Sequence, residues 1–282
     1  MKSIRTIAVC GAGTMGSGIA QLTAQAGFNT IQFDLSPAAL EKSRLGIVAQ
    51  LNKLVEKSKI TPEEKEQILG RIRFSPELAD CRADVIIEAI IENKEIKTKL
   101  FNDLAAFNDA SVIFATNTSS ISIDAIAEGM AHPEKLVGMH FFNPAPVMKL
   151  VEVIRGSRTA DSLVEQVYQL AQQLGKVPVI CKDAPGFIVN RVARHYYLEA
   201  MQMVEKGLIT AEQADAAMEA AGFKMGPFKL MDLIGLDINY SVSNIVWEAL
   251  GRPERLTPSP LQQAKLREGK LGKKTSEGFY KY

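Results

Sequence analysis

Two residues in the middle of the chain have the types and the spacing for acid–base chemistry. His140 ends an apolar run, and Glu152 follows it after a turn that contains Pro144 and Pro146. Histidine titrates near neutral pH and suits proton transfer, while a neighbouring carboxylate can fix its tautomer. A lone histidine beside apolar residues is, however, more often a hydrogen-bonded core residue. The catalytic interpretation therefore needs support from the rest of the chain.

Two further polar residues lie where such chemistry could use them. Ser119 follows a predicted strand at residues 111–117, and Asn190 lies near the start of a long predicted helix. Ligands of open α/β sheets bind at the carboxyl ends of the strands, so we expect Ser119, His140 and Glu152 at one edge of a sheet. We expect Asn190 to approach them across a cleft between two domains. A helix-capping serine and a solvated asparagine are the alternatives.

A glycine-rich loop near the N-terminus predicts a dinucleotide site. Gly11, Gly13 and Gly16 form a GxGxxG pattern between a predicted strand at residues 6–10 and the start of a helix. The first glycine permits a tight turn, the second lets the backbone approach a pyrophosphate, and the third lets the helix pack on the strand. The helix N-terminus then offers N–H groups to the phosphates. A glycine turn without a ligand is the alternative, and the order of strand, loop, helix, strand and acid disfavours it.

The acid in that order is Asp34, which ends the second predicted strand. A carboxylate at this point can accept a hydrogen bond from the ribose 2′-hydroxyl, and it would repel a 2′-phosphate. The sequence therefore favours NAD over NADP as the cofactor. A P-loop nucleotide site is disfavoured because the chain has no GxxxxGK[ST] pattern.

An alternation of strand and helix patterns fills the first two thirds of the chain. It predicts an α/β fold with a Rossmann-type, doubly wound, mostly parallel sheet. Two predicted helices between Ser36 and about Gly70 are longer than one crossover needs, and we expect them to project as an insertion. Strand patterns end before Pro185, so we expect an NAD-binding domain at residues 1–184 and a smaller all-helical domain at residues 185–282. The strands are predicted at residues 6–10, 30–34, 84–90, 111–117, 136–142, 149–153 and 177–183.

The composition argues against several classes of protein. The 282 residues include 33 basic and 32 acidic side chains, a net charge of +1, so no basic field favours nucleic acid or a membrane surface. No apolar run approaches the roughly 18 residues of a membrane helix, and the N-terminal segment lacks the features of a secretory signal. Cys10, Cys81 and Cys181 are widely spaced, which indicates neither a metal site nor a disulfide framework. We expect a cytoplasmic protein.

Seven segments extend these motifs along the whole chain. They are GAGTMGSGIAQ, EAIIENKEIK, NTSS, HFFNPAPVMKLVE, KDAPGFIVNR, GPFKLMDLIGLD and GKKTSEGFYKY. In this order they resemble the short-chain L-3-hydroxyacyl-CoA dehydrogenases, and the bacterial 3-hydroxybutyryl-CoA dehydrogenases in particular. Two departures are visible: Ser276 stands where many relatives have glycine, and RVARHYYLEA differs from the usual apolar run, which could alter the preferred acyl chain.

The resemblance implies an NAD-dependent enzyme that interconverts (S)-3-hydroxyacyl-CoA and 3-oxoacyl-CoA, with 3-hydroxybutyryl-CoA and acetoacetyl-CoA as the expected pair. It implies that His140 is the general acid and base, that Glu152 orients it, and that Ser119 and Asn190 bind the substrate near its 3-oxygen. It also implies a homodimer formed through the C-terminal helical domain.

The resemblance further implies two sets of binding residues. For the CoA moiety they are Gln50 and Lys57, on the projecting helices. From the sequence alone, Glu92 and Lys97 fit an ordinary pair on a helix surface, and Lys57 fits a solvated face. The residues implied for NAD are Gly11, Ala12, Gly13, Thr14, Met15, Gly16, Asp34, Glu92, Lys97, Ser119, Asn143 and Lys274.

Two rival functions remain at this stage. A relative of the same fold could oxidise a free hydroxy acid, and a non-catalytic relative could bind NAD only. The combination of Ser119, His140, Glu152 and Asn190 argues against the second. The physiological direction and the range of acyl chains are not determined by the sequence.

Overall fold

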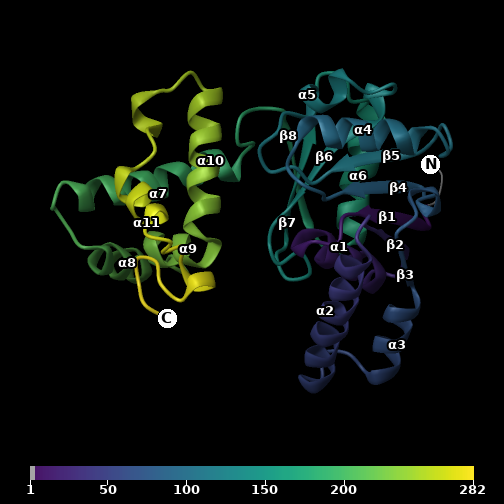
Figure 1. Cartoon of the computed structure of the whole chain (residues 1–282), viewed down its shortest axis with the longest axis horizontal. Helices are drawn as coiled ribbons and strands as arrows, with labels where there is room; N and C mark the ends of the chain where they lie inside the picture. Colours follow the sequence, from purple (N-terminus) through teal and green to yellow (C-terminus); the bar gives the residue numbers. More distant parts are fainter. Residues whose placement is uncertain (1–3) are drawn as a thin grey trace. The chain divides into compact units, whose positions relative to one another are not determined.

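The computed structural model describes residues 4–282 of the chain. It divides into two compact units, Met1–Asp183 and Ala184–Tyr282. Figure 1 shows a sheet with flanking helices in the first unit and a group of helices in the second. None of the helices in the described part of the chain has the length and apolar character needed to cross a bilayer.

The eight strands within residues 4–282 form one sheet in the order β3-β2-β1-β4-β5-β6-β7-β8. Neighbouring strands are parallel, except that β6 and β7 are antiparallel. The predicted mostly parallel, doubly wound sheet is confirmed. Its strands are β1 (Thr6–Cys10), β2 (Asn29–Phe33), β3 (Ile72–Ser75), β4 (Val85–Glu88), β5 (Ile113–Thr116), β6 (Leu136–Phe141), β7 (Leu150–Arg155) and β8 (Val177–Lys182).

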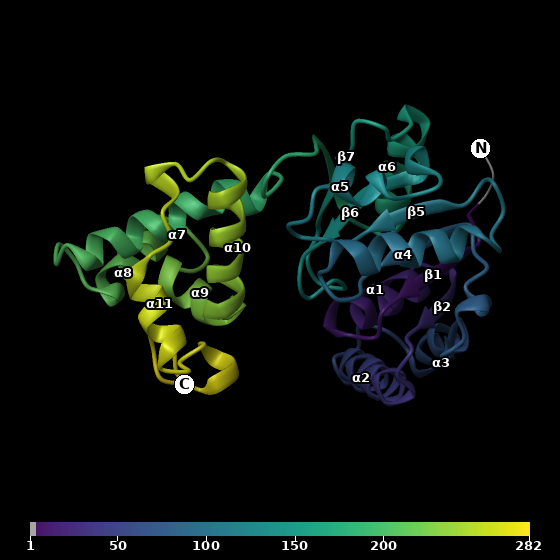
Figure 2. The same ribbon diagram turned by 45° about the horizontal axis from the view of Figure 1, so that its top comes forward.

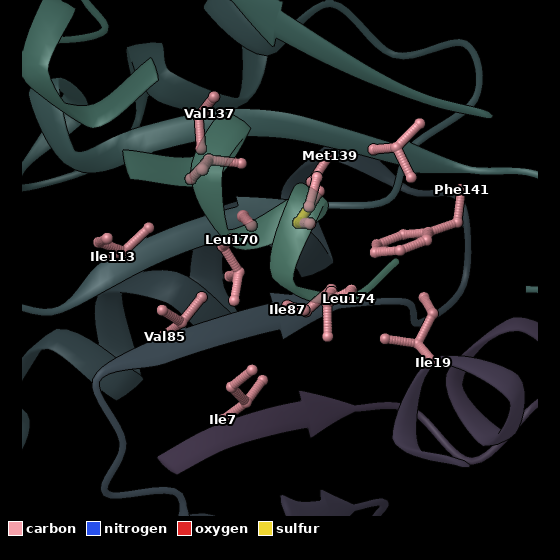
Figure 3. Close-up of a cluster of buried hydrophobic side chains, with 14 of the residues drawn as sticks. Ile7, Ile19, Val85, Ile87, Ile113, Val137, Met139, Phe141, Leu170 and Leu174 are labelled. Atoms are coloured by element: carbon pink, nitrogen blue, oxygen red, sulfur yellow. The ribbon is translucent and has the colours of Figure 1, made fainter. Parts of the chain in front are cut away.

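Helices cover both faces of this sheet. Ile113 packs in one apolar cluster with Ile19 of α1 and Leu170 of α6 (Figure 3). The adjacent Phe114 points to the other face and contacts Phe101 of α4, with ring centroids 5.3 Å apart. Parallel strands are stable when both faces are buried in this way. The helices of this unit are α1 (Thr14–Gln25), α2 (Pro37–Glu56), α3 (Pro62–Gly70), α4 (Lys94–Ala105), α5 (Ile123–Glu128) and α6 (Asp161–Gln173).

Helices α2 and α3 connect β2 to β3 and extend away from the sheet (Figures 1 and 2). The predicted capping box is present, because the Thr61 side chain accepts from the backbone of Glu64 and the Glu64 side chain accepts from the backbone of Thr61. Edge strand β3 is absent from the strands predicted above. Its four residues include the exposed Arg73, and the alternation of Ile72 and Phe74 with arginine was the signal that could have revealed it.

The second unit consists mainly of helices around one apolar core, as predicted. The segment at residues 226–251 divides into two helices because Gly235 adopts a φ of +101°, a backbone conformation that suits glycine. The buried Asp232 accepts hydrogen bonds from the backbone N–H groups of Phe279 and Tyr280 and thereby holds the C-terminal segment. The helices are α7 (Val189–Glu205), α8 (Ala211–Ala220), α9 (Pro227–Ile234), α10 (Leu236–Ala249) and α11 (Pro260–Arg267).

The loop between β6 and β7 is held by a buried lysine. Lys176, just before β8, donates from Nζ to the carbonyl oxygens of Ala145 at 2.5 Å and Met148 at 2.9 Å. Ala145 belongs to the same apolar cluster as Ile19 of α1, so the loop is also packed against that helix. Burial lowers the pKa of Lys176 to about 8. Lys176 thus fixes the loop that separates His140 from Glu152, and burying its ammonium costs free energy.

The cost of burying the Lys176 ammonium predicts that the stability of the protein depends on pH. Between pH 8 and the ordinary lysine pKa of 10.5, the native protein binds fewer protons at Lys176 than the unfolded chain does. The free energy of unfolding should therefore rise with pH across that window and should not change below it on this account. In Lys176→Met, the rise should be smaller by about 2 kcal/mol. Urea unfolding at about pH 7.5 and about pH 10 checks this, and equal slopes in the two proteins would contradict it.

Candidate active site

The pairing of β6 with β7 brings His140 and Glu152 together. The two residues are direct partners in the antiparallel register, and Nδ1 of His140 lies 2.7 Å from Oε2 of Glu152. Both side chains are buried, at the carboxyl edge of the parallel strands. The ring of Phe142 contacts that of His140, with centroids 4.6 Å apart. Because Nδ1 faces the carboxylate, Nε2 is the nitrogen that can exchange a proton with a substrate.

A carboxylate organises the turn that carries Ser119. Oε1 of Glu92 accepts from the Thr118 hydroxyl at 2.6 Å, from the Ser119 backbone N–H at 3.0 Å, and from both the backbone N–H and the hydroxyl of Ser120. The side chain of Ser122 caps α5, so Ser119 is not the helix cap considered above. Ser119 is therefore held at the end of β5 by a side chain from the segment after β4.

Lys97 is buried, which excludes the ordinary surface pair that its spacing suggested. Its side chain is 1% exposed, and Nζ lies 2.5 Å from Oε1 of Glu88 and 3.1 Å from Oε2 of Glu92. Burial raises the pKa of the Glu88 carboxyl, and the charge of Lys97 opposes that effect. Burial also acts to raise the pKa of Glu92, but Lys97 and the neighbouring hydroxyls outweigh it and hold this pKa low. Sequence reasoning missed Glu88, although a carboxylate inside an apolar strand was a signal.

The glycine loop has the geometry of a phosphate-binding turn. Gly11 has a φ of +112°, and a Cβ there would lie 2.5 Å from the carbonyl oxygen of Ala89. A Cβ at Gly16 would lie 2.0 Å from the carbonyl oxygen of Gly11, so α1 approaches the loop backbone closely. A Cβ at Gly13 would meet nothing within 4 Å, which leaves open space in front of the helix N-terminus. These residues fit a dinucleotide pyrophosphate.

A cavity of about 810 Å³ continues from this loop and fits the nucleoside end of NAD. Asp34 lies on its wall, where Oδ2 accepts from the Ala12 backbone N–H at 2.8 Å and Oδ1 accepts from the Ser36 backbone N–H at 2.9 Å. A carboxylate has about four acceptor positions, so Asp34 can still bind a ribose hydroxyl. The apolar lining suits a flat base. It includes Leu35, Leu78, Ile91, Ile96 and Leu100.

The other residues implied for binding lie outside this cavity. Asn143 is exposed in the loop between β6 and β7. Gln50 and Lys57 are exposed near the C-terminal end of α2, where a separation of seven residues places them on one side of the helix. These placements are compatible with contacts to ligands, and the roles of these residues stay predictions.

Asn190 and Lys274 belong to the second unit. The backbone carbonyl of Asn190, in the first turn of α7, accepts from Nε of Arg194 at 2.9 Å. Nζ of Lys274 lies 2.5 and 2.6 Å from the two carboxylate oxygens of Asp237, a partner that the sequence did not suggest. Ser276 has a φ of +60°, a backbone conformation that glycine adopts more readily than serine. The approach of Asn190 and Lys274 to the cofactor or substrate stays a prediction.

Comparisons with known proteins place these features in a family. The model of the 3-hydroxyacyl-CoA dehydrogenase NAD binding domain matches residues 6–184, and that of the 3-hydroxyacyl-CoA dehydrogenase C-terminal domain matches residues 186–282. The chain belongs to the 3-hydroxyacyl-CoA dehydrogenase family. The resemblance drawn from the sequence motifs is thereby confirmed.

Individual members of the 3-hydroxyacyl-CoA dehydrogenase family match over nearly the whole chain. A 3-hydroxyadipyl-CoA dehydrogenase of Escherichia coli is 46% identical over 99% of this chain, which spans only 59% of that protein. A probable 3-hydroxybutyryl-CoA dehydrogenase of Deinococcus radiodurans is 43% identical, with 97% of this chain and 99% of that protein covered. The crystal structure of an (S)-3-hydroxybutyryl-CoA dehydrogenase from Ralstonia eutropha is 39% identical, with a TM-score of 0.95 and 99% of both chains covered.

The contacts of Asp34 predict how the protein selects its cofactor. The unaltered protein should have a lower kcat/KM with NADPH than with NADH, because the carboxylate opposes a 2′-phosphate. Asp34→Ser should reduce the ratio of kcat/KM with NADH to kcat/KM with NADPH about tenfold. It should also lower kcat/KM with NADH, since the Ala12 N–H loses its acceptor. Asp34→Asn is the matched control, because its amide oxygen can still accept from Ala12. Steady-state kinetics with both cofactors measure these effects, and equal use by the unaltered protein would contradict the role of Asp34.

Proposed function

We propose that this chain is an NAD-dependent dehydrogenase that interconverts (S)-3-hydroxyacyl-CoA and 3-oxoacyl-CoA. The observation that carries the proposal is the buried His140–Glu152 contact, at the edge of a dinucleotide-binding sheet in a chain of this family. A short acyl chain, as in acetoacetyl-CoA, is the expected substrate, because three of the proteins and structures that match are named for 3-hydroxybutyryl-CoA.

The geometry assigns a role to each member of the pair. In the oxidative direction, Nε2 of His140 accepts the proton of the 3-hydroxyl group, while Nδ1 donates a hydrogen bond to Glu152. The carboxylate fixes this tautomer and stabilises the imidazolium that forms. Bound NAD supplies the acceptor for the hydride that leaves C3. Ser119 and Asn190 donate hydrogen bonds to the 3-oxygen as its charge changes.

Binding is assigned to groups outside this pair. The loop from Gly11 to Gly16 binds the pyrophosphate, and Asp34 binds the ribose. Asn143 and Lys274 also contact the cofactor in this proposal. Gln50 and Lys57 bind the nucleotide end of CoA in this proposal. Because both side chains are exposed, each should contribute only modestly to the binding free energy, and the contribution of the lysine charge should fall as salt is added. The proposal includes a homodimer formed through the helical unit and a cytoplasmic location.

One assay tests the reaction. Purified protein should oxidise NADH in the presence of acetoacetyl-CoA, and His140→Ala should be slower by about 10² to 10⁴. Free acetoacetate should be a poor substrate if CoA recognition is part of the function. Equal rates with acetoacetate would favour a dehydrogenase of free hydroxy acids. NADH binding without turnover of either compound would favour a non-catalytic protein.

The direct contact between His140 and Glu152 predicts strong non-additivity. Glu152→Gln should lose somewhat less activity than His140→Ala, because it leaves the imidazole in place without its partner. Residues that act as one unit give overlapping losses. The double variant should therefore be scarcely slower than His140→Ala alone. The measurement is kcat for folded variants that still bind NADH. Losses that multiply would assign Glu152 a separate role.

A second substrate class is favoured by Arg194 on α7. Its side chain is 3% exposed, and its guanidinium lies 5.0 Å from the ring centroid of Tyr197. It donates hydrogen bonds to oxygens without formal charge, namely the carbonyls of Asn190 and Asn239 and the hydroxyl of Ser243. Burial lowers the pKa of Arg194 to about 10, and no carboxylate pairs with it within the described part of the chain. Buried cations are usually paired with an anion. A carboxylate at the far end of an acyl chain, as in the 3-hydroxyadipyl-CoA named for the Escherichia coli relative, would supply one.

If acyl-CoA substrates with a terminal carboxylate bind Arg194, replacing this arginine should lower activity with those substrates more than with others. Arg194→Met should lower kcat/KM for 3-oxoadipyl-CoA at least about tenfold more than for acetoacetyl-CoA, and Arg194→Lys should retain part of the preference. Arg191→Met, which removes a charge from the same helix at a less buried position, is the control. Equal losses for both substrates in Arg194→Met would mean that this arginine only connects α7 to α10.

A further inference from the structure

We propose that Glu88 is a positioning residue that acts through Lys97 and Glu92 on the turn that carries Ser119. These three charged residues are called here the charged triad; Glu88 and Lys97 are buried, and Glu92 is partly exposed. The inference rests on the proposed function, since Ser119 is assigned there to the substrate. Glu88 itself is buried below the surface and touches neither cofactor nor substrate in this proposal.

Glu88 is fixed on every side by groups from different elements. Oε2 accepts from the hydroxyl of Thr116 at 2.6 Å, which ties the end of β4 to the end of β5. Oε1 accepts from the backbone N–H of Ile90 at 2.8 Å and from Nζ of Lys97 at 2.5 Å. Ile90 lines the 810 Å³ cavity, so one carboxylate joins the wall of the nucleoside cavity to the strand that leads to Ser119.

Lys97 transmits the position of Glu88 to Glu92. Its ammonium lies between the two carboxylates, at 2.5 Å from the first and 3.1 Å from the second. With one positive and two negative charges, the two carboxylates share a single ammonium and the site carries an excess negative charge. If Glu88 lost its charge, the buried ammonium would have Glu92 as its only anionic neighbour and would draw that carboxylate toward itself.

Glu92 in turn holds the Ser119 turn by one oxygen. Oε1 accepts the backbone N–H of Ser119 and two donors of Ser120, while Oε2 contacts Lys97. A displacement of Glu92 toward Lys97 therefore lengthens the bonds at Oε1. Catalysis depends steeply on such positions, since a misplacement of about 1 Å can cost about a hundredfold in rate. The triad thus explains why a fully buried lysine lies beneath a dinucleotide site.

A purely structural role makes a different prediction from positioning. A buried ion pair often contributes little net stability, and replacing both partners by neutral groups can restore what a single replacement loses. Glu88→Gln keeps the size of the side chain but leaves Lys97 with Glu92 alone. The double variant Glu88→Gln/Lys97→Met removes both charges and also removes the contact of Lys97 with Glu92. Stability should recover in the double variant, whereas the position of Glu92 should not.

The test combines kinetics with backbone hydrogen exchange. Glu88→Gln should lower kcat for acetoacetyl-CoA reduction about tenfold or more, with KM for NADH changed less than about threefold. Exchange of the Ser119 and Ser120 amides should become faster. In the double variant, the melting temperature should return toward that of the unaltered protein while kcat stays low. Glu95→Gln, the same substitution on the exposed side of α4, is the control. It should change neither kcat nor the exchange rates of the Ser119 and Ser120 amides.

The outcomes separate this inference from the proposed function. If kcat recovers together with stability in the double variant, the triad is only structural. Unchanged amide exchange of Ser119 and Ser120 in Glu88→Gln would also overturn the inference, whether or not the protein turns over acetoacetyl-CoA. If the unaltered protein reduces no 3-oxoacyl-CoA, the proposed function fails, and faster amide exchange in Glu88→Gln would still support the coupling between Glu88 and the turn.

Discussion

The antiparallel pairing of β6 with β7 is the constraint on which the site depends. It places His140 directly opposite Glu152, at the distance of one hydrogen bond. A slip of one residue would turn each side chain to the opposite face of the sheet, so the register must be fixed. The apolar neighbours fix it from both faces, and Lys176 fixes it from the loop by binding two carbonyl oxygens. The reversal of strand direction at this point brings the two side chains of the proposed acid–base pair together.

The carboxyl edge of the sheet carries several buried ionisable groups. Glu88, Lys97 and Glu152 are all nearly inaccessible to solvent. Burying ionised groups is costly unless each finds partners, and here each has one within hydrogen-bonding distance. Such arrangements contribute little to net stability. Their value lies in fixed geometry, which is what a cofactor loop, a hydroxyl-bearing turn and a proton-transfer group require.

Family membership determines the type of reaction, but it does not determine the acyl group of the substrate. Relatives of similar identity are named for 3-hydroxybutyryl-CoA and for 3-hydroxyadipyl-CoA, two acyl groups that differ by a terminal carboxylate. The proposed catalytic pair does not distinguish them, because the proposed reaction takes place at the same carbon of both acyl groups. In the second substrate class proposed above, the buried Arg194 would respond to such a difference in charge.

The sequence by itself determined those features whose physics is local. The glycine loop, the acid at Asp34 and the capping box at Thr61 each depend on residues close in the chain, and the alternation of strand and helix patterns determined the fold class. The His140–Glu152 contact was also within reach, because one short turn joins their strands. Motifs that span the chain identified the family.

Tertiary structure alone decided which charges are buried and which partners they have. Lys97 and Glu92 fit a surface pair until α4 packs on the sheet and encloses the lysine with Glu88. The Lys274–Asp237 pair joins residues 37 positions apart. Strand β3 is too short to be distinctive until it pairs with β2. In each case the interaction energy depends on groups that are distant in the sequence. Burial strengthens the interactions of a charge, and the sequence shows that the charge exists but not that it is buried.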